Sequence, residues 1–169
     1  VFQYVAIWSA KKVQARPWGI LLMLSLVTAV FSALLDNVTT VLLIAPITLL
    51  ITEELRADPY PFLFAEIFAS NIGGTATLIG DPPNIMIGSA AGLTFNDFVV
   101  NLAPITPLIL LITLFIIYGI WGRGMEATDK ARQRIMEFRE RDAITDVVLL
   151  KKSLLVLTLV MVAFIFAHQ

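Results

Sequence analysis

The sequence that decides the fold runs from Ser70 to Ile87 and reads Ser-Asn-Ile-Gly-Gly-Thr-Ala-Thr-Leu-Ile-Gly-Asp-Pro-Pro-Asn-Ile-Met-Ile. Three glycines, a carboxylate, two adjacent prolines and two asparagines interrupt an otherwise apolar segment. Each proline removes a backbone N–H donor and disrupts helical hydrogen bonding, which leaves carbonyl groups without partners. In a bilayer such groups must find protein, water or an ion. The interruption therefore marks a candidate binding site.

The composition is that of an integral membrane protein. Of the 169 residues, 58% are hydrophobic and 15% are charged, and the mean hydropathy is +0.85. Soluble domains average about 45–50% apolar and about 25% charged residues, so we expect the lipid bilayer as the main partner, and no nucleic acid. The absence of cysteine excludes disulfides and thiolate sites. Because the sequence starts and stops within apolar runs, we expect a fragment of a longer protein.

Residues 18–52 predict a re-entrant helical hairpin. They are apolar except for Asp36-Asn37-Val38-Thr39-Thr40. A single helix over this segment would be about 50 Å long, whereas the hydrocarbon core measures about 30 Å. Two arms, 18–35 and 41–52, fit better, and the second arm of about 18 Å is too short to cross. The polar tip is then expected near mid-membrane, although two full spans would satisfy the same topology.

The remaining segments predict an all-α integral membrane protein. We expect a transmembrane helix over residues 62–91 that is discontinuous at its middle, a polar loop over 92–101 and a span over 102–122. Residues 123–152 hold eight positive and six negative charges, which predicts a charged linker helix. Residues 153–169 predict the start of a further transmembrane helix.

The distribution of basic residues predicts the sidedness of these segments. Lys11, Lys12 and Arg16 form one basic cluster, and the linker 123–152 forms another, whereas the loop 92–101 has no Lys or Arg. Cytoplasmic loops carry the excess of basic residues. We therefore expect the linker in the cytoplasm and the loop outside, with the protein in the plasma (inner) membrane if it is prokaryotic.

Three carboxylates fall within apolar segments: Asp36, Glu66 and Asp81. A charge at the centre of a bilayer costs about 2.5–3.5 kcal/mol on insertion scales, so each side chain should face protein or a water-filled cavity. Glu66 lies four residues before Ser70. It could relay protons, hold a cation or simply hydrogen-bond a neighbouring helix, and the sequence favours none of these.

The hairpin tip and the interrupted helix both place helix ends where ions bind. The N-terminus of the return arm offers N–H groups to an anion. The C-terminus of the first arm offers carbonyl groups to Na⁺, and a broken helix does the same near the midplane. Helix caps in an ordinary surface turn are the alternative for the tip, and a proline-kinked span is the alternative for the break.

The predicted substrate- and ion-binding residues are the polar, glycine and proline residues of the two breaks: Asp36, Asn37, Thr39, Thr40, Asn71, Gly73, Gly74, Thr75, Thr77, Gly80, Asp81, Pro82, Pro83 and Asn84. The candidate Na⁺ ligands are Asn37, Gly80 and Asp81. We expect no organic cofactor, and Na⁺ or H⁺ is the expected coupling ion.

Two motifs resemble a known family. They are Ser-Ala-Leu-Leu-Asp-Asn-Val-Thr-Thr at 32–40 and Ala-Ser-Asn-Ile-Gly-Gly-Thr-Ala-Thr-Leu-Ile-Gly-Asp-Pro-Pro-Asn-Ile at 69–85. Together they resemble the ion transporter superfamily, in the group of arsenite-pump membrane subunits, sodium/proton antiporters and melanocyte P proteins, also called citrate-transporter-like permeases. The resemblance covers residues 1–122 and extends more loosely into the linker.

The resemblance implies an inverted-repeat, elevator-type secondary transporter, with residues 1–122 as part of its first repeat. It also implies a homodimer, and an ATPase subunit as a partner if the protein is arsenite-pump-like. In the dicarboxylate and citrate relatives, a Ser-Asn-Thr tip binds sodium and substrate. Here Asp36 replaces the serine before Asn37, and Asp81 stands where relatives often carry threonine. The added negative charge favours cation or proton coupling over a carboxylate substrate.

We therefore expect a transporter rather than an enzyme. The expected function is secondary active transport of a small ion, including arsenite or Na⁺/H⁺ exchange, coupled to a cation gradient. One alternative is an intramembrane aspartyl protease in which Asp36 and Asp81 share a proton. The Gly-x-Gly-Asp motif expected of such a protease is absent, because Leu78 occupies its first position. A passive ion channel is the other alternative.

Overall fold

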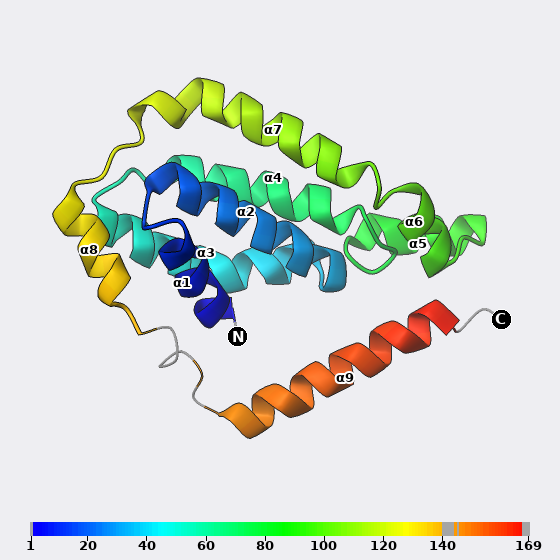
Figure 1. Cartoon of the computed structure of the whole chain (residues 1–169). Coiled ribbons are helices and arrows are strands. Elements are labelled where there is room, and N and C mark those ends of the chain that lie inside the picture. Colours follow the sequence, from blue (N-terminus) through cyan, green and yellow to red (C-terminus); the bar gives the residue numbers. More distant parts are fainter. Residues whose placement is uncertain (1, 140–143, 145, 167–169) are drawn as a thin grey trace.

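The computed structural model describes residues 2–139, 144 and 146–166, and all regular structure in these residues is helical. The helices are α1 (Phe2–Lys12), α2 (Pro17–Leu34), α3 (Asn37–Leu55), α4 (Tyr60–Gly74), α5 (Pro82–Ala91), α6 (Phe95–Asn101), α7 (Thr106–Trp121), the 3₁₀ helix η1 (Gly122–Gly124), α8 (Asp129–Glu137) and α9 (Val147–Phe166) (Figure 1). The all-α prediction is confirmed for these residues. Four segments are long and apolar enough to cross a membrane: 17–34, 37–55, 106–124 and 147–166.

Helices α2, α3 and α4 form the centre of the fold. In Figure 1, α2 and α4 run in the same direction, and α3 runs in the opposite direction from the end of α2 to the start of α4. The apolar core is made by these three helices together with α1 and α7. At Gly73 of α4, an added Cβ would lie 2.2 Å from the carbonyl oxygen of Ala29 of α2. Glycine and alanine therefore let the two backbones approach closely, as small residues do between membrane helices.

The α2–α3 hairpin has two arms of similar length. Helix α3 begins at Asn37, because the Asp36 carboxylate caps it by accepting the Thr39 N–H at 2.8 Å. At 19 residues, α3 is about 28 Å long. The predicted return arm over 41–52 was therefore wrong, and arm length gives no reason for a re-entrant segment. The residues expected to form a polar turn are the first turn of α3.

The predicted break in the helix over 62–91 is present. Helix α4 starts at Tyr60 and ends at Gly74, and α5 begins at Pro82, so residues 75–81 are not helical. Pro82 and Pro83 occupy the first turn of α5, where a proline is tolerated because the N–H groups there have no helical partner. The double proline thus permits a helix after the break and prevents one across it.

Two predicted segments differ from the observed helices. The loop predicted over 92–101 contains α6, which Thr94 and Asp97 cap reciprocally, and α7 begins at Thr106 rather than 102. In the linker predicted as one helix over 123–152, the described residues contain the end of η1, the whole of α8 and the start of α9, which begins at Val147 rather than 153. Residues 140–143 and 145 of the predicted linker and residues 167–169 of the predicted last helix lie outside the described residues.

Helix α8 lies across the end of the bundle formed by α1 and α3 (Figure 1). The Arg132 side chain donates to the Gln14 carbonyl at 3.1 and 3.0 Å, and Arg134 lies 3.8 Å from Glu54. Ile135 is fully buried in the core. The first basic cluster and the linker therefore share one end of the molecule, as the charge distribution requires, and α5 and α6 lie at the opposite end. The cytoplasmic location of that end stays a prediction.

We predict that Gly73→Ala destabilises the complete protein. The new Cβ cannot fit without moving the backbone of Ala29, and overpacking of this kind typically costs about 1–3 kcal/mol. Melting of the purified protein in detergent measures the effect, and we expect a lower midpoint than for the native protein. Gly119→Ala in α7 is the control, because nothing lies within 4 Å of its added Cβ. Equal melting of both variants would contradict the close contact of α2 and α4.

Candidate functional site

The hairpin tip and the helix break lie against each other. The backbone N–H of Asn37, at the start of α3, donates to the Gly80 carbonyl at 3.1 Å. The Thr77 hydroxyl donates to the Ala33 carbonyl, in the last turn of α2, at 2.6 Å. Polar groups that lack a helical partner at one interruption thus form hydrogen bonds with groups at the other. The arrangement follows the rule that polar backbone within apolar surroundings is satisfied internally.

The side-chain amide of Asn37 joins three segments. Its NH₂ group donates to Asn71 Oδ1 of α4 at 2.9 Å and to Asp81 Oδ1 at 3.2 Å. Its own oxygen accepts the Val38 N–H at 2.9 Å. The amide therefore connects α3, α4 and the residue that precedes α5. We call Asn37, Asn71 and Asp81 the amide–carboxylate network.

Buried polar groups hold the shape of residues 75–81. Asn84 Nδ2 donates to the carbonyls of Gly74 at 3.2 Å and Thr77 at 2.9 Å, and the Thr77 hydroxyl accepts the Gly80 N–H at 3.1 Å. A Cβ on either Gly74 or Gly80 would lie 2.5 Å from the other residue's carbonyl oxygen. Thr77, Asn84 and the two glycines therefore form the support beneath the network rather than its surface.

Several predicted site residues stay outside the network. The side chain of Thr39 is exposed, and Thr40 is fully buried with its hydroxyl unpartnered. Thr75 donates to the Ile72 carbonyl of its own helix at 2.6 Å. Asp36 serves as the cap of α3, and the two prolines are exposed on α5. The structure thus brings together only part of the predicted set.

The N-terminus of α3 has no free N–H group to offer an anion, contrary to expectation. All four of its first N–H groups already donate: Asn37 to Gly80, Val38 to Asn37 Oδ1, Thr39 to Asp36 Oδ1 and Thr40 to the Asp36 carbonyl. The first two residues of α5 are prolines, which have no N–H. The expected anion site at the hairpin tip is therefore wrong for this conformation.

Oxygen atoms are the groups still available at the tip. In the part of the chain that the structure describes, the second carboxylate oxygen of Asp81 has no hydrogen bond, and Asp81 is only half-buried. Of the predicted Na⁺ ligands, Asp81 and the Gly80 carbonyl supply oxygens, whereas Asn37 presents its NH₂ group. No group of three or more His, Asp or Glu side chains occurs among the described residues. The carboxylate and carbonyl oxygens at the tip suit a monovalent cation as ligands better than they suit a transition metal.

A hollow of about 250 Å³ opens beside the network. Its lining comes from the first turns of α3 and the last turns of α4: Asn37, Val38, Val41, Leu42, Ile67, Ser70 and Asn71. Polar groups of the network thus lie at the edge of an otherwise apolar depression. A small solute in this hollow would contact the first turns of α3 and the last turns of α4, including Asn37 and Asn71 of the network.

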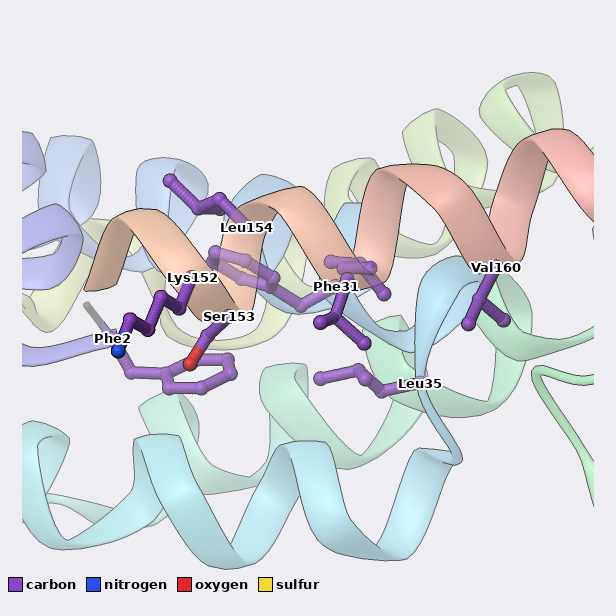
Figure 2. Close-up of a pocket in the computed structure, with 9 residues that line it drawn as sticks. Phe2, Phe31, Leu35, Lys152, Ser153, Leu154 and Val160 are labelled. Carbon is purple, nitrogen blue, oxygen red and sulfur yellow. The ribbon is translucent and has the colours of Figure 1, made fainter. Parts of the chain in front are cut away.

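A larger hollow of about 550 Å³ lies elsewhere, between α9 and the α1–α2 pair. Figure 2 shows Phe2, Phe31 and Leu35 on one side, with Lys152, Ser153, Leu154 and Val160 of α9 on the other. Its lining is almost wholly apolar, and the carboxylates and amides of the two breaks are not part of it. We therefore place the candidate site at the network and not here.

Glu66 occupies a separate, interior position on α4. It is 1% exposed and accepts a hydrogen bond from the Thr48 hydroxyl of α3. Its second oxygen, Oε2, has no hydrogen-bond partner. The hydrogen bond to a neighbouring helix, one of three roles considered for this residue, is thus present but accounts for only one carboxyl oxygen.

Sequence reasoning missed the polar stripe of α2. Ser25, Thr28 and Ser32 are fully buried and follow the three- and four-residue spacing of one helix face. The Ser32 hydroxyl donates to the Ser70 carbonyl at 2.6 Å, which ties α2 to α4 just before the break. The signal was present as hydroxyls at helical spacing within the apolar residues 17–34, whereas the predicted site residues came only from the two breaks.

The two aspartates do not form a protease dyad. The Asp36 carboxylate caps α3, and the Asp81 carboxylate is held by Asn37. No hydrogen bond joins the two carboxyls in the described residues. Two carboxyls that share one proton must lie in direct contact. The geometry gives no support to the protease alternative.

Similarity to known proteins agrees with the resemblance found in the sequence. The model of the citrate transporter family, CitMHS, matches residues 1–168. The chain belongs to this family. The CitMHS match spans the hairpin, the interrupted helix and the linker, so all residues of the amide–carboxylate network lie within it.

Individual relatives are membrane proteins and transporters by name. The chain is 56% identical over 169 residues to a 46 kDa membrane protein of Mycobacterium leprae and 51% identical over 168 residues to an uncharacterized transporter of Mycobacterium tuberculosis, covering 99% of this chain in each case. It is 44% identical over 106 residues, 60% of the chain, to the human P protein. The chain spans 39% of the length of the two mycobacterial relatives and 13% of the P protein.

We predict that Thr77→Val loosens the support of the site. The substitution leaves the Ala33 carbonyl and the Gly80 N–H without their hydroxyl partner, and a buried unsatisfied group costs about 1–3 kcal/mol. Thermal melting of the complete protein should therefore show a lower midpoint. Thr113→Val on α7 is the matched control, because its exposed hydroxyl bonds only to the Ile109 carbonyl of its own helix. Equal midpoints for both variants would contradict the role of Thr77.

Proposed function

We propose that the complete protein is a secondary active transporter of a small ion, and that the amide–carboxylate network binds the coupling cation. Membership in a transporter family supports the transport function. The observation that carries the site is the Asn37 amide, which bonds to both Asn71 and Asp81 where two helix breaks meet. Polar groups at the meeting point of discontinuous helices are typical of transporter binding sites.

The local electrostatics favour a cation over a free anion. Asp36 and Asp81 bring two carboxyl groups to the tip, and the N–H groups of the first turn of α3 are already committed. An approaching carboxylate would meet like charge at Asp36 and Asp81 and would find no free N–H group in the first turn of α3. The family description names citrate, a tricarboxylate, and such a substrate would have to enter with bound cations. We therefore propose Na⁺ or H⁺ as the coupling ion and leave arsenite, citrate and Na⁺/H⁺ exchange to the assay.

The proposed transport mechanism involves the hairpin. We propose that the hairpin gates access to the site, so that the site opens to one side of the membrane at a time. The elevator motion, a second inverted repeat and a homodimer are further parts of this proposal, since the chain spans 39% of its mycobacterial relatives. The four apolar helices support integration in a membrane, and we propose the plasma membrane.

We predict that Asn37→Ala and Asp81→Ala abolish ion-driven flux. Each variant removes one side of the contact that joins the two breaks, while the apolar helices that direct insertion are unchanged. The assay uses the complete protein in liposomes, with Na⁺, H⁺, arsenite and carboxylates, including citrate, varied in turn. Insertion is checked by the amount of protein recovered in the vesicles.

The same residue types at remote positions provide controls. Asn101→Ala removes an exposed amide in α6, and Asp129→Ala removes an exposed carboxylate in α8. Both should retain flux. Unchanged flux in the Asn37 and Asp81 variants would refute the site. Solute flux that needs no Na⁺ or H⁺ gradient would instead indicate a channel.

We predict that a cysteine at position 39 reports the movement of the hairpin. The Thr39 side chain is exposed at the tip and hydrogen-bonds to the Asp36 carboxyl rather than to Asn37, Asn71 or Asp81, so Thr39→Cys should leave the network intact. A membrane-impermeant thiol reagent should label it from one side of the vesicle, and the labelling rate should change when the coupling ion is added. Equal labelling under all conditions would indicate an ordinary exposed turn.

A further inference from the structure

The interior of the bundle contains polar side chains that the proposed transport site does not use. Three buried oxygen-bearing groups on α2 and α4 have no hydrogen-bond partner: the hydroxyls of Ser25 and Thr28, and Oε2 of Glu66. Each of these residues is at most 1% exposed. A buried polar atom without a partner is rare in folded proteins and requires an explanation.

The contacts between α2 and α4 place these groups on facing surfaces. Ser32 of α2 bonds to the carbonyl of Ser70 of α4, and Gly73 packs on Ala29. Ser25 lies between Ser32 and Ala29 on the α2 helical wheel, because residues seven and four positions apart share a face. Glu66 lies one turn before Ser70 on the matching face of α4. Because α2 and α4 run in the same direction (Figure 1), the helical spacing from these contacts predicts that Ser25 and Thr28 lie on the side of α2 toward Glu66.

No positive side chain within the packed helices neutralises Glu66. Helices α2 and α7 contain no charged residue, and Glu66 is the only charged residue of α4. Helix α3 adds Glu53 and Glu54 in its last turn, and α1 adds Lys11 and Lys12 in its last turn, at the end of the bundle covered by α8. A buried carboxylate without a partner charge is strongly unfavourable. Neutralisation must therefore come from a bound ion.

We propose that Glu66, together with the hydroxyls of Ser25, Thr28 and Thr48, forms an internal site for one monovalent cation, either a proton or Na⁺. The carboxylate provides the charge, and the three hydroxyls provide neutral oxygens. The site is distinct from the amide–carboxylate network, to which no hydrogen bond in the described residues connects it. It deepens the proposed function, on which its role in transport rests, by giving the coupling ion an interior position on α4.

The position of the site explains how its occupancy would reach the hairpin tip. Glu66 binds Thr48 of α3 and lies one turn before Ser70, which is held by Ser32 of α2. Asn71, the next residue, belongs to the network. Glu66 thus lies where α2, α3 and α4 are in contact, one turn of α4 before the place where the two breaks meet. A change of charge at Glu66 would alter this contact.

The test measures ion-dependent melting of the complete protein in detergent, which needs no transported substrate. A ligand that binds only the folded state raises the melting midpoint, and the rise grows with the logarithm of the ligand concentration once that concentration exceeds the dissociation constant. The midpoint of the native protein should rise when NaCl replaces choline chloride, if Na⁺ binds, or on acidification in choline chloride, if a proton binds. Glu66→Gln is neutral and of the same size, and in this variant the part of the rise that comes from ion binding at Glu66 should be lost.

Further variants of the interior site and control variants elsewhere separate the possible results. Ser25→Ala and Thr28→Val should shift the response to higher cation concentration, and they keep the test decisive if Glu66→Gln does not fold. Glu53→Gln and Thr158→Val should respond like the native protein, because Glu53 is exposed and the Thr158 hydroxyl bonds only to the Leu154 carbonyl of α9. The part of the rise in melting midpoint that depends on Glu66 should also remain in Asp81→Asn.

Two outcomes would overturn the inference. One is the absence of any rise with Na⁺ or acid in the native protein, and the other is an unchanged rise in both Glu66→Gln and Thr28→Val. The proposed function is tested separately, because it fails if Asp81→Ala transports normally. Loss of flux in Asp81→Ala, together with an unchanged ion response in both Glu66→Gln and Thr28→Val, would therefore refute only the interior site.

Discussion

The contact between Asn37 and the interrupted helix is the interaction on which the rest of the structure depends. Two breaks in apolar sequence release backbone groups that lipid cannot satisfy. In this fold each break supplies the partners of the other, through the Asn37 N–H on the Gly80 carbonyl and the Thr77 hydroxyl on the Ala33 carbonyl. The glycines between α2 and α4 allow the close approach that these bonds need. A polar site follows as a consequence of this packing.

Some polar residues at the two breaks maintain the shape of the backbone, and others form the more accessible part of the proposed site. The side chains of Thr77 and Asn84 are buried and bond only to groups of the break, of α2 or of the last residue of α4, so they maintain the shape of the break. Asn37 and Asn71 line a hollow at the accessible edge, and Asp81, which Asn37 holds, is only half-buried. Membership in the citrate transporter family supports the proposed transport function, and the N–H groups of α3 that already donate hydrogen bonds support the proposed preference for a cation.

The sequence predicted the helical class, the hairpin and the break between α4 and α5, because prolines and glycines in apolar runs have strong local effects. It misplaced the start of α3, because a capping aspartate and a polar turn look alike until the Thr39 N–H is seen to donate to Asp36. It missed α6 although Thr94 and Asp97 form a capping box, and it missed the hydroxyl stripe of α2. Contacts between distant helices, such as Ser32 with Ser70, have no local sequence signal.

The central claim is that the hairpin tip and the helix break form one unit through Asn37 and Asp81. A double-mutant cycle on the complete protein tests it most directly, with the free energy of unfolding measured for Asn37→Ala, Asp81→Ala and the double variant. Residues in contact typically show a coupling of about 0.5–3 kcal/mol, and we expect a value in this range. Effects that add to within about 0.3–0.5 kcal/mol would show that the two residues are independent, and would contradict the account.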